Sequence, residues 1–193
     1  MTTIEAVEEG VVSMPQTREL DLDSLVTGIP AMTPACAGYF KEACMVCLDS
    51  QDHSSGVGLS VDWGGDNEDL TVRWLDTVDS QTRAAHRDLR KATDPAACAI
   101  ALLLVRELTD YTAIEQAVIG TTVDYFLARQ PLDDTLMFNC TARLEASGIL
   151  KEKGSNTVEA RVKEKLARLK HEGLPALIVI VEFANPKSKM VQS

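Results

Sequence analysis

The chain has 193 residues, of which 45% are hydrophobic and 25% are charged, and its formal net charge is −10. This length suits one domain with a short extension, and this composition excludes wholesale disorder. No apolar run reaches the ~18–20 residues of a membrane span, and the acidic N-terminus lacks the pattern of a signal peptide, so we expect a cytoplasmic protein without membrane segments.

The charge is unevenly distributed along the chain. Residues 1–76 hold 14 acidic and 3 basic residues, whereas residues 151–193 hold 5 acidic and 9 basic ones. Because contacts with phosphates need cations, only the C-terminal part is suited to an anionic partner.

The first part of the chain is predicted to be an extension followed by strands. Residues 1–35 contain three prolines and a run of acids, which indicates a loosely packed acidic extension to a single domain over 36–193. This extension is either a solubilising segment or a docking arm for a basic surface. The segments 41–50, 57–63 and 70–75 are apolar-rich or alternate in hydropathy, and they predict an antiparallel meander of three strands.

Helices are expected next. One runs from residue 79 or 80 to about 92, and Asp94-Pro95 predicts a second start, with Asp as the cap and Pro at the first helical position. The second helix, 96–108, is apolar on most faces and is expected to be buried. Thr112 and Glu115 have the spacing of a capping box, which predicts a short helical turn.

Two strands, a helix and a final strand follow. In the strand predicted over 138–149, two sets of side chains alternate between the faces: Cys140, Ala142, Leu144 and Ala146 on one, and Thr141, Arg143, Glu145 and Ser147 on the other. A shorter strand is expected over 123–128, and an amphipathic helix with a cationic stripe over 158–170. The unbroken apolar run LIVIVEF predicts a strand buried on both faces. The fold class is therefore α/β (α+β).

Asp124 and Glu145 lie on the two successive strands. Two such carboxylates can share a hard cation such as Mg²⁺, which activates water and stabilises charge on a phosphate. Glu115 or Glu107 is a candidate third carboxylate. Acids on strand faces are also common as surface or structural groups, and Arg143, on the same face as Glu145, is its alternative partner.

These residues also carry a resemblance. Val123-Asp124, Leu144-Glu145-Ala146-Ser147 and the basic helix EARVKEKLARL are similar to motifs of the restriction-endonuclease-like PD-(D/E)XK nuclease superfamily, over about residues 95–186. The likeness implies a helix-strand-strand-helix-strand core that hydrolyses DNA or RNA with Mg²⁺. It implies that Asp124, Glu145 and Glu115 are metal ligands and that Lys163 or Lys165 is the catalytic lysine, which helps to position water or phosphate. It also implies that the nucleic acid is contacted by Arg161, Lys165 and Arg168.

One position departs from that pattern. The second motif of the superfamily has a lysine where this chain has Ser147. This departure and the net acidity favour an alternative, in which an inactive nuclease-like fold serves as a protein-interaction subunit of a larger bacterial complex. A setting in bacterial defence and a protein partner or homo-oligomer are expected in either case. The stretches GTTVDYFL, ARLEASGI and VEFANP also look like a bacterial family of unassigned function.

The cysteines and histidines give weaker signals. The five cysteines are an odd number, which argues against a disulfide framework. Cys44 and Cys47 form one CxxC pair, to which Cys36 and His53 would add a zinc ligand set of unfamiliar spacing, so buried apolar cysteines are the better interpretation. His53 has no identifiable nucleophile beside it, and His86 lies on a small basic face.

Overall fold

The computed structural model describes residues 18–132, 139–169 and 173–193, and these form a mixed α/β fold. The strands are β1 (Arg18–Asp21), β2 (Val57–Trp63), β3 (Asp66–Arg73), β4 (Tyr111–Gln116), β5 (Tyr125–Arg129), β6 (Ala142–Ile149), β7 (Ala176–Glu182) and β8 (Lys187–Gln192). The helices are the 3₁₀ helix η1 (Leu22–Val26), α1 (Pro34–Asp49), α2 (Ser80–Ala85), α3 (Leu89–Leu108) and α4 (Val158–Leu169). All eight of these strands belong to one sheet, in the order β1-β3-β2-β8-β7-β6-β5-β4.

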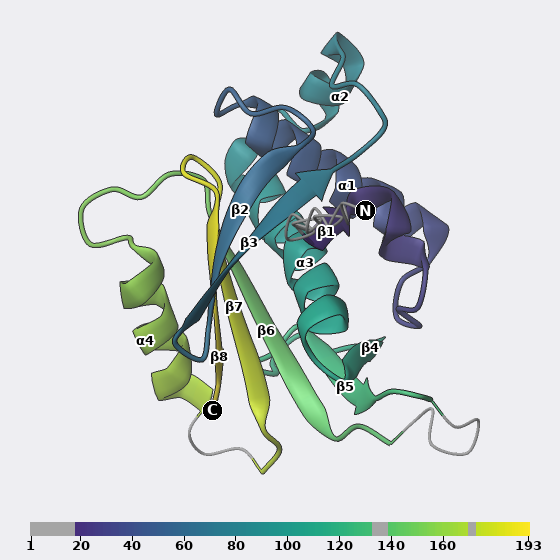
Figure 1. Ribbon diagram of the computed structural model, residues 1–193, viewed down its shortest axis with the longest axis vertical. Helices are drawn as coiled ribbons and strands as arrows, with labels where there is room; N and C mark the ends of the chain where they lie inside the picture. Colours follow the sequence, from purple (N-terminus) through teal and green to yellow (C-terminus); the bar gives the residue numbers. More distant parts are fainter. Residues whose placement is uncertain (1–17, 133–138, 170–172) are drawn as a thin grey trace, which may run out of the picture.

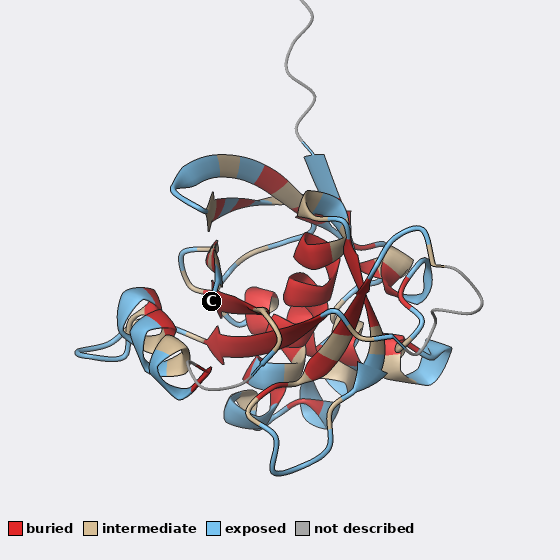
Figure 2. Ribbon diagram, turned by 90° about the horizontal axis from the view of Figure 1, so that it is seen from below, coloured by how far each residue is buried: buried red, intermediate tan, exposed pale blue. Residues whose placement is uncertain are grey.

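The described elements form three layers. Helices α1 and α3 cover one face of the sheet and α4 covers the other (Figure 1). Strand β7 is buried on both faces, as the run LIVIVEF predicts, since Leu177, Val179 and Val181 belong to the core under α3 while Ile178 and Ile180 pack in the cluster under α4. Figure 2 shows the buried residues concentrated in the central strands and the helices of the larger core, with the outer side of α4 exposed.

Strand pairing explains how the two faces are covered. Strands β4, β5 and β6 pair antiparallel, and α4 then crosses over to β7, which pairs parallel to β6. The hairpin of β7 and β8 is antiparallel, and β2 joins β8 in parallel. A parallel pair requires such a crossover, so α4 is fixed over β6 and β7 by the topology itself.

The predicted three-strand meander is wrong in one of its strands. Segment 57–63 and residues 70–73 of segment 70–75 do lie in the antiparallel hairpin of β2 and β3, but residues 41–49 belong to α1. Thr33 caps this helix by accepting a hydrogen bond from Cys36 N (3.3 Å), and Pro34 begins it. Both a buried helix and a buried strand produce an unbroken apolar run, so hydropathy alone does not separate them.

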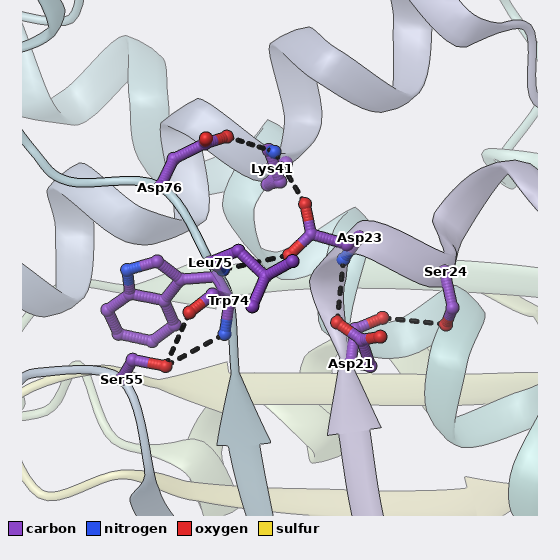
Figure 3. A network of polar contacts seen from close by, with 8 residues as sticks. All are labelled: Asp21, Asp23, Ser24, Lys41, Ser55, Trp74, Leu75 and Asp76. Carbon is purple, nitrogen blue, oxygen red and sulfur yellow. Dashed lines mark hydrogen bonds and ion pairs between the residues drawn. The ribbon is translucent and has the colours of Figure 1, made fainter.

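Residues 18–35 are packed against the domain, contrary to the loose extension expected there. Leu20, Leu22 and Leu25 belong to the core, and β1 pairs parallel to β3. Figure 3 shows the polar contacts that hold η1, where the Asp23 carboxylate accepts from Lys41 Nζ (2.7 Å) and from Leu75 N (2.9 Å). Lys41 also pairs with Asp76. Residues 1–17, the rest of the predicted extension, lie outside the described residues.

Four further segments differ from the predictions. The helix expected from residue 79 or 80 to about 92 ends at Ala85, and a separate helix, α3, begins at Leu89. Asp94-Pro95 lies inside α3, whose cap is Asp88, and not at a helix start. The segment with Thr112 and Glu115 is strand β4 and not a helical turn, with Thr112 Oγ1 donating to Gly28 O (2.7 Å). Strand β8 follows Asn185-Pro186, where no strand was expected. The first residue of the strand predicted over 138–149 and the last of the helix predicted over 158–170 lie outside the described residues, and the observed elements are β6 and α4.

Candidate functional site

Asp124 and Glu145, here called the acid pair, meet on the α4 side of the sheet. Asp124 directly precedes β5, where its N–H donates to Leu144 O (2.8 Å) and its carboxylate accepts from Ala146 N (2.8 Å). These two bonds turn the Asp124 carboxylate toward the middle of β6. Its side chain there shares a hydrogen bond with the carboxyl group of Glu145. The two acids named from the sequence therefore converge.

The acid pair retains a proton more strongly than ordinary carboxyl groups do. Burial raises the pKa of Glu145 to about 7, and the neighbouring Asp124 carboxylate adds to the rise while Lys165 opposes it. Burial also raises the pKa of Asp124, against the effect of the hydrogen bond from Ala146 N. Two close carboxylates repel when both are ionised, so the pair favours a bound proton or additional positive charge.

Helix α4 places a row of cations opposite β6. The basic row consists of Arg161, Lys165 and Arg168, which are four and three residues apart and therefore lie along one face of the helix. Lys165 Nζ pairs with Glu145 Oε1, and Arg161 Nη1 donates to Ser147 Oγ (2.8 Å). Four residues of helix span about 6 Å and two residues of strand about 6.6 Å, so successive cations match successive side chains of the strand.

Two surface cavities open beside the acid pair. A cavity of about 300 Å³ is lined by Thr121, Thr122, Val123, Asp124, Glu145, Lys165 and Arg168. A second, of about 530 Å³, is lined by Asp94, Ser147, Ser155, Asn156, Ala160, Arg161, Glu164, Lys165 and Arg168. Lys165 and Arg168 line both cavities, so the two form neighbouring parts of one polar surface that carries both acids and cations.

Asp94 belongs to this surface, although the sequence pattern indicated only a helix cap. Its carboxylate approaches Gly148 N (3.4 Å) at the end of β6, and its charge contributes to the raised pKa of Asp124. Gly148 makes this possible, because a Cβ at that position would lie 2.4 Å from Thr93 O. Asp94 is an acid directly before the apolar run of residues 96–105, which is a signal that could have identified it, but the following proline favoured the interpretation as a helix cap.

Other candidates lie elsewhere. Glu115 is exposed on β4 and Glu107 is exposed near the end of α3, where Arg106 pairs with it (2.9 Å), and neither lines the two cavities. Lys163 is exposed on α4 and lines neither cavity. Arg143 is buried and donates to Leu174 O (2.6 Å), while the cation at Glu145 is Lys165.

The cysteine pair is part of the core. Cys44 and Cys47 are buried in α1, and burial raises the pKa of Cys47 to about 12.

His53 Nε2 contacts Ala184 O (3.0 Å), and His86 Nε2 lies 3.3 Å from Glu42 Oε2. Within the described ranges no three His, Cys, Asp or Glu side chains form a group able to hold a metal ion by themselves. A cation at the acid pair would therefore take its remaining ligands from water or substrate.

Comparisons with protein-family models, with curated proteins and with solved structures give no match to this chain. Among the described helices, none combines the length and the hydropathy needed to cross a membrane.

Proposed function

We propose that this chain is a Mg²⁺-dependent phosphodiesterase that hydrolyses DNA or RNA. The observation that carries the proposal is the convergence of Asp124 and Glu145 beside Lys165, at a cavity that Arg168 also lines. Two carboxylate oxygens suit Mg²⁺, which keeps several waters and binds protein sites through one or two carboxylates together with substrate phosphates. When bound, such an ion supplies an activated water and stabilises charge on the phosphate.

The arrangement of elements supports a restriction-endonuclease-like core. The two acids lie at successive strands, β5 and β6, with a buried helix before them and a basic helix after them. This is the order that the resemblance of residues 95–186 implies, with β4 as an additional strand between α3 and β5. The pairing of β7 parallel to β6 keeps α4 over the acid pair.

The residues have distinct proposed roles. Asp124 and Glu145 would hold the metal ion, and Asp94, through its charge, would add to the attraction for a cation. Lys165 would position water or phosphate, since its ammonium group lies at Glu145 and lines both cavities. Arg161 and Arg168 would bind neighbouring phosphates. In this account Arg161, held by Ser147, brings positive charge to the strand position where the superfamily has a lysine.

The alternative function, an inactive nuclease-like interaction subunit, is favoured by one contact. Lys165 pairs internally with Glu145, so the acid pair already has a cation beside it. Under this alternative the ion pair is structural, α4 is a contact surface, and Mg²⁺ has no measurable affinity for the chain.

A cleavage assay separates these functions. The full chain is incubated with single-stranded and duplex DNA and RNA, in Mg²⁺ and in Mn²⁺, alongside Asp124→Asn, Glu145→Gln and the control Glu115→Gln. Substitution of groups behind metal ligands costs about 10–100-fold in activity, so loss of a ligand itself should cost at least ~100-fold. The control removes the same charge from an exposed strand and should leave cleavage unchanged. No cutting by the wild type, or equal cutting by Asp124→Asn, contradicts the proposal.

A further inference from the structure

The loop between β4 and β5 presents two large apolar side chains to solvent. Val118 is 72% exposed and Ile119 is fully exposed, and together they are called the apolar tip. They lie next to each other at the end of a hairpin, with Gly120 in the left-handed region (φ 101°) at the turn. Adjacent exposed aliphatic side chains on a projecting loop have no role in the core, which directs attention to a binding role.

The loop is held in one shape by its own hydrogen bonds. Ala117 N donates to Asp124 O (2.8 Å), which closes the base of the loop. Thr121 Oγ1 donates to Val118 O (2.8 Å) and also lies 3.1 Å from Val123 O, so one hydroxyl joins both arms. A tip that is ordered before binding loses less conformational entropy when it is buried against a partner.

The apolar tip is continuous with the proposed active site. Thr121, Thr122 and Val123, which follow the tip, line the same cavity as the acid pair, Lys165 and Arg168. Asp124 follows Ile119 by five positions in the sequence, which limits the distance between their Cα atoms to about 17 Å. That limit corresponds to about five steps of a nucleic-acid strand at about 3.4 Å each.

We propose, on the basis of the proposed function, that Val118 and Ile119 insert between neighbouring bases of the nucleic acid, close to the phosphodiester bond at the acid pair. Aliphatic side chains are known to act as wedges that unstack base steps. Lys165 and Arg168 pair with Glu145 and Glu164 in the structure, and they bring positive charge to the cavity beside the tip. That charge favours a strand of phosphates there, whereas an apolar contact with a protein would not need it. Unstacking bends the strand, which exposes a backbone phosphate to the cavity.

The test measures base stacking directly. Oligonucleotides with 2-aminopurine, whose fluorescence rises when it is unstacked, are prepared as single-stranded and duplex DNA and RNA, with the probe moved along the strand. They are titrated in Mg²⁺ with full-length Glu145→Gln protein, so that binding is read without turnover. The same background carries Val118→Ser/Ile119→Ser, or the control Leu75→Ser, which changes a residue 88% exposed near the end of β3.

The proposal expects a fluorescence rise confined to a few adjacent probe positions, in whichever nucleic acid the chain binds. The double variant should abolish that rise and weaken binding about tenfold or more, the factor expected for losing the burial of one large aliphatic side chain. Leu75→Ser should match its parent. No rise with any oligonucleotide, or an equal rise in the double variant, overturns the proposal, including the case in which the tip binds a protein.

Failure of the wedge and failure of the proposed function give different results. If the wild-type chain cuts nucleic acid but the double variant unstacks bases as its parent does, the wedge is wrong and the phosphodiesterase stands. If the chain unstacks bases but wild type cuts nothing, the phosphodiesterase is wrong and the wedge stands.

Discussion

Lys165, on α4, pairs with Glu145, on β6, across the interface between the helix and the sheet. The lysine side chain is 17% exposed and the glutamate side chain 9%, and Glu145 also shares a hydrogen bond with Asp124. One cation thus faces two carboxyl groups, and the ionised site carries one net negative charge. This imbalance favours uptake of a proton or a divalent cation.

The imbalance predicts a pH-dependent stability in the absence of divalent ions. The pKa of Glu145 is raised from 4.5 to about 7, so the unfolded chain releases this proton first as the pH rises. The folded state then binds more protons between these values, and the free energy of unfolding falls across the window from about pH 4.5 to 7, by at most ~3 kcal/mol from this group. Urea unfolding at a series of pH values measures the effect.

Glu145→Gln provides the comparison for that series, because it removes the titrating group at similar size. The stability of this variant relative to wild type should increase from pH 4.5 to 7 and stay level above that window. A difference that is constant with pH would show that Glu145 ionises normally in the folded protein.

A second prediction concerns the basic row. If Arg161 contacts a phosphate, Arg161→Gln should reduce the slope of log K against log salt concentration for nucleic-acid binding by about 0.9. Fluorescence anisotropy with a labelled oligonucleotide, in the Glu145→Gln background, gives the slope. Lys163→Gln removes the same charge two residues away, from an exposed position outside both cavities, and should leave the slope close to that of the parent. Equal slopes for Arg161→Gln and its parent would exclude Arg161 from the phosphate contacts.

A third prediction concerns the contact of α3 with β6. A Cβ at residue 148 would meet Thr93 O at 2.4 Å and Thr93 Cγ2 at 2.5 Å, so Gly148→Ala must displace the helix or the strand. Such overpacking costs about 1–3 kcal/mol, measured by urea unfolding. Gly58→Ala is the control, because nothing lies within 4 Å of the added Cβ. Equal stability of the two variants would mean that the helix is not in close contact with the strand.

A fourth prediction concerns the attachment of η1. Burial alone would raise the pKa of Asp23, but the hydrogen bonds from Lys41 and Leu75 N outweigh it and lower that pKa. Lys41→Met leaves Asp23 and Asp76 without this cation and should cost about 1–3 kcal/mol in the free energy of unfolding, since the partly buried Asp23 carboxylate loses its charged donor and keeps the bond from Leu75 N. Arg18→Gln breaks an exposed pair with Glu68 and should cost less than about 1 kcal/mol. A similar cost for both would indicate that the Lys41 contact adds no more to the attachment of η1 than an exposed ion pair does.

The sequence predicted the parts of the fold that have a clear hydropathy pattern. The α/β class, the two-faced burial of β7 and the amphipathic helix α4 were predicted correctly, as was the alternation along β6. In that strand, Leu144 and Ala146 face the core under α3 while Glu145 and Ser147 face the cations of α4. In strands and amphipathic helices with one polar face, the period of the hydropathy pattern shows which face is buried.

The elements that were predicted wrongly lack a hydropathy pattern that identifies one type of element. Helix α1 is buried over much of its length, so its apolar run fits a strand equally well. Asp94-Pro95 has the signature of a helix start, but α3 begins earlier, at Leu89, and continues through the proline. Tertiary packing overrode the local start signal at Asp94-Pro95, whereas in α1 the apolar run was ambiguous.

The candidate site was predicted in its acids and in most of its cations. Asp124, Glu145, Lys165, Arg161 and Arg168 meet at one surface, whereas Glu115 and Lys163 do not line it. Asp94 and the apolar tip were missed, because their roles depend on where α3 and the loop between β4 and β5 lie in space.

The most direct test of the central claim is the binding of Mn²⁺, followed by electron paramagnetic resonance, in wild type, Asp124→Asn and Glu115→Gln. The account predicts that one Mn²⁺ binds per chain at near-neutral pH and that Mg²⁺ displaces it. The affinity for Mn²⁺ should fall by at least about tenfold in Asp124→Asn and be unchanged in Glu115→Gln. Mn²⁺ that fails to bind wild type, or that binds Asp124→Asn equally well, would contradict the assignment of the acid pair as a metal site.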